Sequence, residues 1–151
     1  MGSLPRVIYV LGAVSLCTEV SAEMVNPLLP GFLAATLGAA PWAIGLIEGA
    51  AGTTAALLKV VAGAWSDRLG RRVPFLVAGY TLAGVARPLM ALATAWPHVL
   101  VLRLLDRVGK GLRTAPRDAL IADVTLPAQR GRAFGVHRAL DHAGAVYLLS
   151  A

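Results

Sequence analysis

Long apolar stretches, separated by short polar turns, constrain the possible folds of this chain most strongly. Residues 7–37, 42–65 and 73–93 are predominantly apolar. At a rise of about 1.5 Å per residue, a helix of roughly 20 residues crosses the hydrocarbon layer of a bilayer. Residues 97–121 and 133–151 have comparable lengths but carry more charge. We therefore expect an all-α membrane protein, a bundle of about five transmembrane helices embedded in the lipid bilayer.

The composition excludes several other classes of protein. Hydrophobic residues make up 57% of the chain and charged residues 15%, against about 25% charged in soluble domains. The net charge is +6, but the basic residues lie between or inside apolar stretches without interleaved aromatic residues, so we expect no nucleic-acid partner. The single cysteine, Cys17, excludes an internal disulfide and a cysteine-based metal cluster. We expect neither a metal site nor a cofactor.

The distribution of basic residues indicates which side of the membrane each turn occupies. The turns at residues 38–41 and 93–98 contain no Lys or Arg, whereas the other connecting segments hold six. Because positively charged loops stay in the cytoplasm, we expect the N-terminus and the loops at residues 66–74 and 122–132 to be cytoplasmic. The six basic residues are Arg6, Arg68, Arg71, Arg72, Arg130 and Arg132.

The first apolar stretch contains three polar residues on one helical face. Glu19, Glu23 and Asn26 have the spacing i, i+4, i+7, which aligns them in a narrow stripe. We expect this helix to be tilted or bent around Pro27 and Pro30. An acidic side chain inside a membrane is costly and usually faces a cavity or a partner. The stripe therefore indicates either the wall of a polar cavity or buried polar packing between helices.

The fourth stretch carries a stronger polar stripe. Six of its charged residues gather within a sector of about 120° on a helical wheel. A charged residue near the bilayer centre costs about 2.5–3.5 kcal/mol, so the stripe must face a water-filled path or paired acids. For Arg113 and Arg117, near the inner end, snorkelling toward the cytoplasm is the alternative. The six residues are Arg103, Asp106, Arg107, Lys110, Arg113 and Arg117.

The two stripes lie at similar depths. Measured from the inner end of the first helix, Glu19 and Glu23 lie about 18 and 24 Å deep. On the fourth helix, Lys110, Arg107 and Arg103 lie about 16, 21 and 27 Å deep. We therefore expect one central cavity in which bases outnumber acids, which favours an anionic or zwitterionic solute, with the acids as candidate carriers of coupling protons. The expected cavity residues are Glu19, Glu23, Asn26, Arg103, Asp106, Arg107 and Lys110.

Other charged residues within the apolar stretches have structural interpretations. Glu48 and Arg87 both lie roughly 9–10 Å from the outer boundary, so we expect them to form an ion pair. Lys59 lies near the inner end of its stretch, where snorkelling is a better explanation than substrate binding. His137 and Asp141 are i, i+4 neighbours, which favours polar packing or a proton relay over a metal site.

The loop between the second and third apolar stretches holds a specific pattern of residues. Gly70 within it suits the positive φ of a tight turn. The pattern resembles the signature loop of the major facilitator superfamily of secondary transporters. Residues 19–30 and 103–121 likewise resemble the first and fourth helices of a poorly characterised bacterial branch of that superfamily. The loop reads Gly63-x-x-x-Asp67-Arg68-x-Gly70-Arg71-Arg72.

The resemblance implies an alternating-access transporter of the bacterial cytoplasmic (inner) membrane, built from two six-helix halves. Residues 1–151 would then form a partial N-terminal transmembrane bundle, which needs the remaining helices of the transporter as partners. In the superfamily the Asp and Arg of the signature loop act as a cytoplasmic latch. By position these are Asp67 and Arg71, with the inner end of the fourth helix near Asp118 as a latch partner.

Two motifs that are typical of the superfamily's drug/proton antiporters are missing from this sequence. Their Gly-x-x-x-Gly-Pro motif on the fifth helix is missing after Gly144, and Arg103-Leu-Leu-Asp106-Arg107 replaces Arg-x-x-Gln-Gly. Both departures argue against a proton-coupled drug exporter. We expect a secondary transporter of a small organic solute, with a non-transporting membrane fragment or assembly subunit as the alternative. No nucleophile arrangement, phosphate-binding loop or metal set indicates an enzyme.

Overall fold

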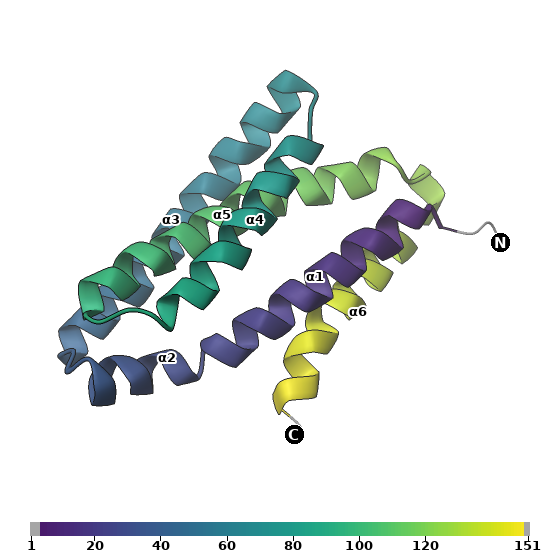
Figure 1. Ribbon diagram of the computed structural model, residues 1–151. Coiled ribbons are helices and arrows are strands. Elements are labelled where there is room, and N and C mark those ends of the chain that lie inside the picture. Colours follow the sequence, from purple (N-terminus) through teal and green to yellow (C-terminus); the bar gives the residue numbers. More distant parts are fainter. Residues whose placement is uncertain (1–3, 150–151) are drawn as a thin grey trace. The chain divides into compact units, whose positions relative to one another are not determined.

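The structure is a computed structural model that describes the backbone of residues 4–149 and the side chains of residues 4–143. The described backbone forms helices and no strand, which confirms the all-α prediction. In chain order (Figure 1), the elements are α1 (Arg6–Val25), α2 (Leu28–Gly31), the π-helical η1 (Phe32–Thr36), α3 (Pro41–Leu69), α4 (Val73–Met90), α5 (Trp96–Asp123), the 3-10 helix η2 (Pro127–Gln129) and α6 (Arg130–Leu149).

The first apolar stretch is not one continuous α-helix. α1 ends at Val25, residues 26–27 form a turn, and the chain continues through α2 and η1. Pro27 precedes α2 with φ −72° and ψ −27°. A proline lacks an N–H donor and its ring clashes with the carbonyl four residues earlier, so the α1 hydrogen-bond pattern cannot pass through it. The expected bend around Pro27 and Pro30 is therefore a break just after Val25.

The other helices begin and end close to the predicted residues. α3 ends at Leu69 rather than at residue 65, and Gly70 follows with φ 60°, in the left-handed region that its turn requires. α4 ends at Met90. α6 begins at Arg130, and residues 150–151 of the predicted fifth stretch lie outside the described residues. The division of these helices into five membrane spans stays a prediction.

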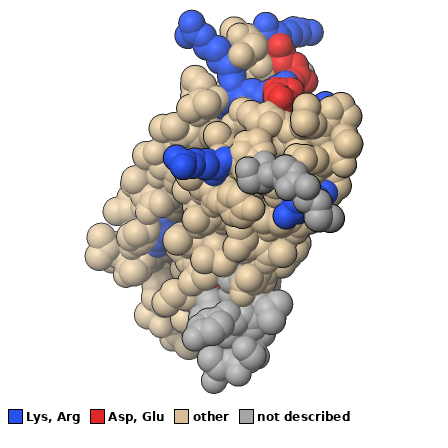
Figure 2. All heavy atoms as spheres, turned by 90° about the vertical axis from the view of Figure 1, so that its right-hand side faces the viewer, with Lys and Arg blue, Asp and Glu red and all other residues tan. Residues whose placement is uncertain are grey.

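Within the described part of the chain, three helical segments are long and apolar enough to cross a membrane: Arg6–Thr36, Pro41–Leu69 and Val73–Met90. This result is based on length and composition. α5 carries the charged stripe and does not meet the same limits. Figure 2 shows one face of the molecule, on which uncharged side chains cover most of the surface. A surface of this kind suits lipid better than water.

The chain divides into two compact units. One comprises residues 1–24 and 117–151, and the other comprises residues 25–116. We call them the terminal unit and the central unit. The terminal unit contains nearly all of α1, the last part of α5, and α6. The central unit contains α2, η1, α3, α4 and the larger part of α5.

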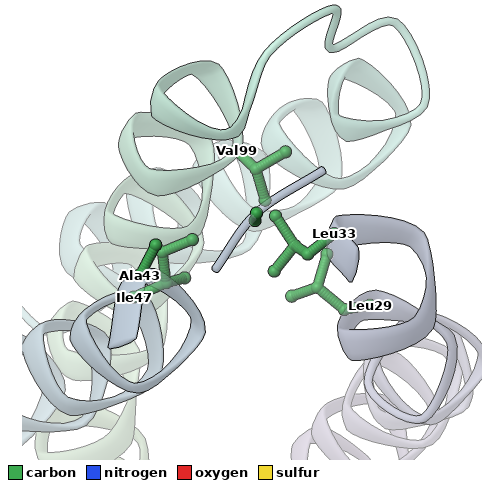
Figure 3. Close-up of a cluster of buried hydrophobic side chains, with 6 residues drawn as sticks. Leu29, Leu33, Ala43, Ile47 and Val99 are labelled. Carbon is green, nitrogen blue, oxygen red and sulfur yellow. The ribbon is translucent and has the colours of Figure 1, made fainter. Parts of the chain in front are cut away.

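Buried apolar side chains form a core at one end of the central unit (Figure 3). Leu29 and Leu33 pack against Ala43 and Ile47 of α3 and against Val99 of α5. Ala39, from the turn before α3, belongs to the same cluster. The core therefore fixes the segment before α3 and the beginnings of α3 and α5 at one end of this unit.

Two tryptophans pack beside this core. Trp42 directly follows one of the two turns that lack basic residues, and Trp96 lies in the other. Their rings meet edge to face with centroids 5.7 Å apart and planes at 78°. The two turns therefore lie at the same end of the central unit, as helices of alternating direction require. Tryptophans at this position suit a membrane–water interface.

Glycines allow α5 to lie directly against the backbones of α3 and α4. A Cβ atom at Gly109 of α5 would lie 2.6 Å from the carbonyl oxygen of Gly79 on α4. A Cβ atom at Gly111 would lie 2.7 Å from Cβ of Leu58 and 3.0 Å from the carbonyl oxygen of Ala55, both on α3. No side chain fits at these distances, so both crossings of α5 depend on glycine.

Gly109→Ala should destabilise the protein by about 1–3 kcal/mol, because the new methyl group would meet backbone atoms of α4 that cannot move aside. The matched control is Gly84→Ala on α4, where no atom lies within 4 Å of the added Cβ. That variant should be neutral or gain up to about 1 kcal/mol from higher helix propensity. The free energy of unfolding in detergent micelles measures both effects, and equal stability of the two variants would contradict the tight crossing.

Candidate functional site

A buried carboxylate, Asp106, organises the charged face of α5. The residue is only 1% exposed. Arg87 of α4 donates its Nε–H to Oδ1 of Asp106 at 2.9 Å. Arg103 Nη1 and Arg107 Nε each lie 3.9 Å from Oδ2. One acid thus offsets part of the charge of three guanidinium groups, which lowers the cost of holding them in an apolar region.

Glu48 of α3 binds Arg103 on another side. Arg103 donates Nε–H to Oε1 at 3.1 Å and Nη2–H to Oε2 at 3.2 Å, a two-pronged pair. Its Nη1–H donates to Oδ1 of Asn26 at 2.9 Å. Arg103 of α5 is therefore bonded both to α3 and to the turn that follows α1. The acceptors are the carboxylate of Glu48 and the amide oxygen of Asn26.

The predicted Glu48–Arg87 pair is wrong. Glu48 binds Arg103, and Arg87 binds Asp106. Equal depth does not establish that two helix faces meet. α5 lies against both α3 and α4, so it supplies the partner of opposite charge to each of them.

A pocket of about 440 Å³ lies between α3 and α5 of the central unit. Small residues on both helices leave the space, and basic residues give the pocket its charge. The α3 wall consists of Glu48, Gly52, Ala55, Ala56 and Lys59, and the α5 wall consists of Arg107, Lys110, Gly111 and Thr114.

The charges of this pocket favour an anionic ligand. Lys59, Arg107 and Lys110 line it together with one acid, Glu48. That acid already accepts the two hydrogen bonds from Arg103. Thr114 donates its hydroxyl hydrogen to the carbonyl oxygen of Lys110 at 2.6 Å, so its oxygen remains an acceptor only. A ligand that carries a carboxylate or a similar group would find positive charge on both walls.

The structure brings together five of the seven predicted cavity residues. Those five belong to the central unit, as members of the Asp106 network, of the pocket, or of both. Glu19 and Glu23 lie partly buried on α1, in the terminal unit. That the two stripes face each other stays a prediction. The five central-unit residues are Asn26, Arg103, Asp106, Arg107 and Lys110.

Lys59 is a pocket residue that was not among the expected cavity residues. It lines the pocket together with Arg107, and the expectation that its exposed side chain snorkels toward the cytoplasm stays a prediction. A signal was present in the sequence. Glu48, Gly52, Ala55 and Lys59 have the spacing i, i+4, i+7, i+11, which places them on one face of α3.

The snorkelling alternative for Arg113 and Arg117 is wrong. Arg113 is 2% exposed, and its guanidinium carbon lies 4.9 Å from the ring centroid of Tyr80, a cation–π contact. Arg117 is also buried, and in the terminal unit it donates Nη1–H to Oγ of Ser15 at 3.2 Å. Neighbouring helices provide these partners, which the pattern of a single helix cannot reveal.

The signature loop is closed on itself by an ion pair. Arg72 donates Nη1–H to Oδ1 of Asp67 at 2.6 Å across the turn that Gly70 makes. Arg71 is exposed. Asp118 belongs to the terminal unit, where its Oδ1 lies 3.4 Å from Nε of Arg117. The latch role of Asp67, Arg71 and Asp118 stays a prediction.

Asp106→Asn should lower the free energy of unfolding by about 3–5 kcal/mol, because it removes the acid that three guanidinium groups share. The matched control is Glu48→Gln, which removes the same charge from a side chain that is 45% exposed. That change should cost about 1 kcal/mol, since water reaches the site. Unfolding in detergent micelles compares the two. Equal losses would show that Asp106 is not the centre of the network.

Comparison with known proteins identifies the family of this chain. The profile of the Major Facilitator Superfamily matches residues 11–149. An uncharacterized MFS-type transporter of Methanocaldococcus jannaschii is 37% identical over 143 residues, which are 95% of this chain and 35% of that protein. An uncharacterized protein of Mycobacterium tuberculosis is 36% identical over 141 residues, 93% of this chain and 34% of that protein.

A named relative is the multidrug resistance protein MdtH of Photorhabdus laumondii. It is 35% identical over 124 residues, which are 82% of this chain and 30% of that protein. The chain therefore spans about a third of the length of these curated relatives. The family profile covers the signature loop, most of α1 and the whole of α3, α4, α5 and α6. On this evidence the chain belongs to the major facilitator superfamily of membrane transporters.

Proposed function

We propose that the protein is a secondary transporter that moves a small anionic or zwitterionic organic solute across the bacterial cytoplasmic membrane by alternating access. Membership of a transporter family supports this role over that of an enzyme or of a non-transporting membrane fragment or assembly subunit. The observation that carries the solute class is the basic pocket between α3 and α5.

The size and chemistry of the pocket support a small organic anion. Its volume of about 440 Å³ falls within the roughly 300–1,000 Å³ of typical small-molecule sites. Arg107 offers a planar fork that matches a carboxylate, and Lys110, nearly one turn further along α5, offers a compact positive charge. Each carboxylate oxygen of Glu48 has a second lone pair, besides the one that Arg103 occupies, and these can accept hydrogen bonds from the ammonium group of a zwitterion.

The remaining sequence predictions extend this proposal. Glu19 and Glu23 on α1 are proposed to complete the polar path and to carry protons if transport is proton-coupled. Asp67 and Arg71 of the signature loop are proposed to latch the cytoplasmic side against the end of α5 near Asp118. The rest of the transporter's helices would close the path during the transport cycle.

Arg107→Gln should reduce uptake at least about tenfold without lowering the amount of protein in the membrane, because it removes one charge-assisted hydrogen bond of about 1.5–3 kcal/mol. A panel of labelled monocarboxylates, dicarboxylates and amino acids, offered to proteoliposomes, identifies a transported compound for this measurement. The matched control is Arg130→Gln, an exposed arginine at the start of α6, which should leave uptake unchanged. Equal uptake by both variants would contradict the role of the pocket.

Export of drugs is the second candidate function. It is favoured by the similarity to MdtH, whose name refers to multidrug resistance. The excess of basic residues in the pocket and the absence of the two antiporter motifs count against a cationic drug. Efflux of ethidium from cells that express the protein distinguishes the two. Efflux that survives Arg107→Gln, with no uptake of any organic anion, would favour drug export.

Cysteine labelling tests the proposed orientation in the membrane. Ala40→Cys and Leu69→Cys, each made in a Cys17→Ser background, place single exposed thiols at opposite ends of α3 without altering a charge. A membrane-impermeant maleimide added to intact cells should label residue 40, and residue 69 only after permeabilisation. The reverse pattern would place the signature loop outside and contradict a cytoplasmic N-terminus.

A further inference from the structure

A cluster of buried polar side chains lies in the terminal unit, apart from the pocket. His137 of α6 is 0% exposed. Its Nε2 lies 3.3 Å from Oγ of Ser15 on α1, which is also buried. The same Oγ accepts a hydrogen bond from Nη1 of Arg117 at 3.2 Å. One hydroxyl therefore connects a histidine and an arginine, on three helices.

Close packing keeps this cluster out of contact with lipid. Gly12 of α1 lies against the side chain of Leu140 on α6, so tightly that an added Cβ would overlap it. Nδ1 of His137 is buried and has no hydrogen-bond partner among the described residues. A buried polar atom without a partner is uncommon, so it needs either a structural or a functional reason.

Four charged side chains lie close enough to the imidazole of His137 to interact with it electrostatically. They are two bases, Arg117 and Arg138, and two acids, Asp118 and Asp141. They come from α5 and α6 and sum to zero charge. Arg117 is shared by both acids, with Nε 3.4 Å from Asp118 Oδ1 and Nη1 3.5 Å from Asp141 Oδ1. Arg138 Nη2 lies 3.9 Å from Oδ2 of Asp118. Asp118 can therefore hold both arginines when Asp141 turns away.

We infer that His137 is a proton-binding site of this transporter. When the imidazole is neutral, its Nε2–H donates a hydrogen bond to Ser15 Oγ, and a second lone pair of that oxygen accepts the hydrogen bond from Arg117. Nδ1 then carries a lone pair that can accept a proton. A hydronium ion gives its proton to Nδ1, which forms an N–H bond and leaves a water molecule. Asp141 lies one helical turn further along α6. Its carboxylate then leaves Arg117 and pairs with the imidazolium, while Asp118 stays paired with Arg117.

The presence of two acids, Asp118 and Asp141, lowers the free-energy cost of protonating His137 inside an apolar protein. If Arg117 had a single carboxylate, protonation of His137 would leave one of the two cations buried without a counter-charge, at a cost of several kcal/mol. With two acids, Arg117 keeps Asp118 as its counter-charge and the imidazolium of His137 gains Asp141. Proton binding does not depend on the solute pocket, whereas its use to drive transport rests on the proposed function.

The alternative is a histidine that stays neutral and only fills space between α1 and α6. The two cases differ in whether the ring protonates while the protein stays folded. Nitrogen chemical shifts of the imidazole ring distinguish the neutral tautomers from the imidazolium. His98 and His142 are exposed, so their signals serve as references for rings that are in contact with water.

The test is NMR of the protein labelled with nitrogen-15 histidine in lipid nanodiscs, from about pH 8 to about pH 5. The signal that disappears in His137→Gln belongs to His137; should that variant not fold, His98→Gln and His142→Gln assign the signal by elimination. We expect His137 to convert to the imidazolium while circular dichroism shows unchanged helix content. Asp141→Asn should lower the ratio of imidazolium to neutral ring at least about tenfold at fixed pH. Asp123→Asn, which removes the same charge from an exposed residue at the end of α5, should leave that ratio unchanged.

Two results would overturn the inference. A His137 ring that stays neutral at every pH at which the helices remain folded would make it a packing residue. Protonation with a ratio that is the same in Asp141→Asn as in the unmodified protein would remove the proposed exchange of Asp141. Solute uptake that fails in Arg107→Gln, or in the unmodified protein, tests the pocket and leaves the reading of the His137 signal unaffected.

Discussion

The cost of holding charge in an apolar environment is the constraint on which this structure depends. α5 carries a run of bases that would be strongly unfavourable against lipid, and the buried carboxylate of Asp106 makes them tolerable. Glu48 adds a second counter-charge from α3, with Arg103 between the two acids. The helices of the central unit are thus joined by charge as well as by apolar contact, at positions where a neutral residue would take a counter-charge away from buried arginines.

Backbone packing makes these charge contacts possible. Gly109 and Gly111 let α5 approach α4 and α3 more closely than any side chain would permit. The short distance brings the arginines within reach of acids on neighbouring helices. Gly111, together with the small residues Gly52, Ala55 and Ala56 of α3, also leaves the space that forms the basic pocket. Packing, ion pairing and the candidate binding site therefore have one origin, the presence of glycines on the charged helix.

The two units handle polar groups in different ways. In the central unit the bases exceed the acids, and the excess lines a pocket that suits an anion. In the terminal unit two bases and two acids balance around His137, with Ser15 as the connecting hydroxyl. An excess of charge favours binding of a charged solute, whereas a balanced set with a shared arginine can accept a proton at low cost. The family membership explains why a membrane protein retains both, since transporters require polar groups within the membrane.

The sequence by itself determined the helices, the family and the identity of most charged residues at the site. Apolar length, the helix-breaking prolines, the left-handed turn at Gly70 and the signature loop are local properties, readable without neighbours. Tertiary structure decided which acid meets which base: it replaced the expected Glu48–Arg87 pair and buried Arg113 against Tyr80. It also placed Lys59 in the pocket. A helical wheel gives the face and depth of a side chain, but the opposing face depends on how closely and at what rotation two helices pack. Here that was set by glycines on α4 and α5, whose effect depends on the helix that each one meets.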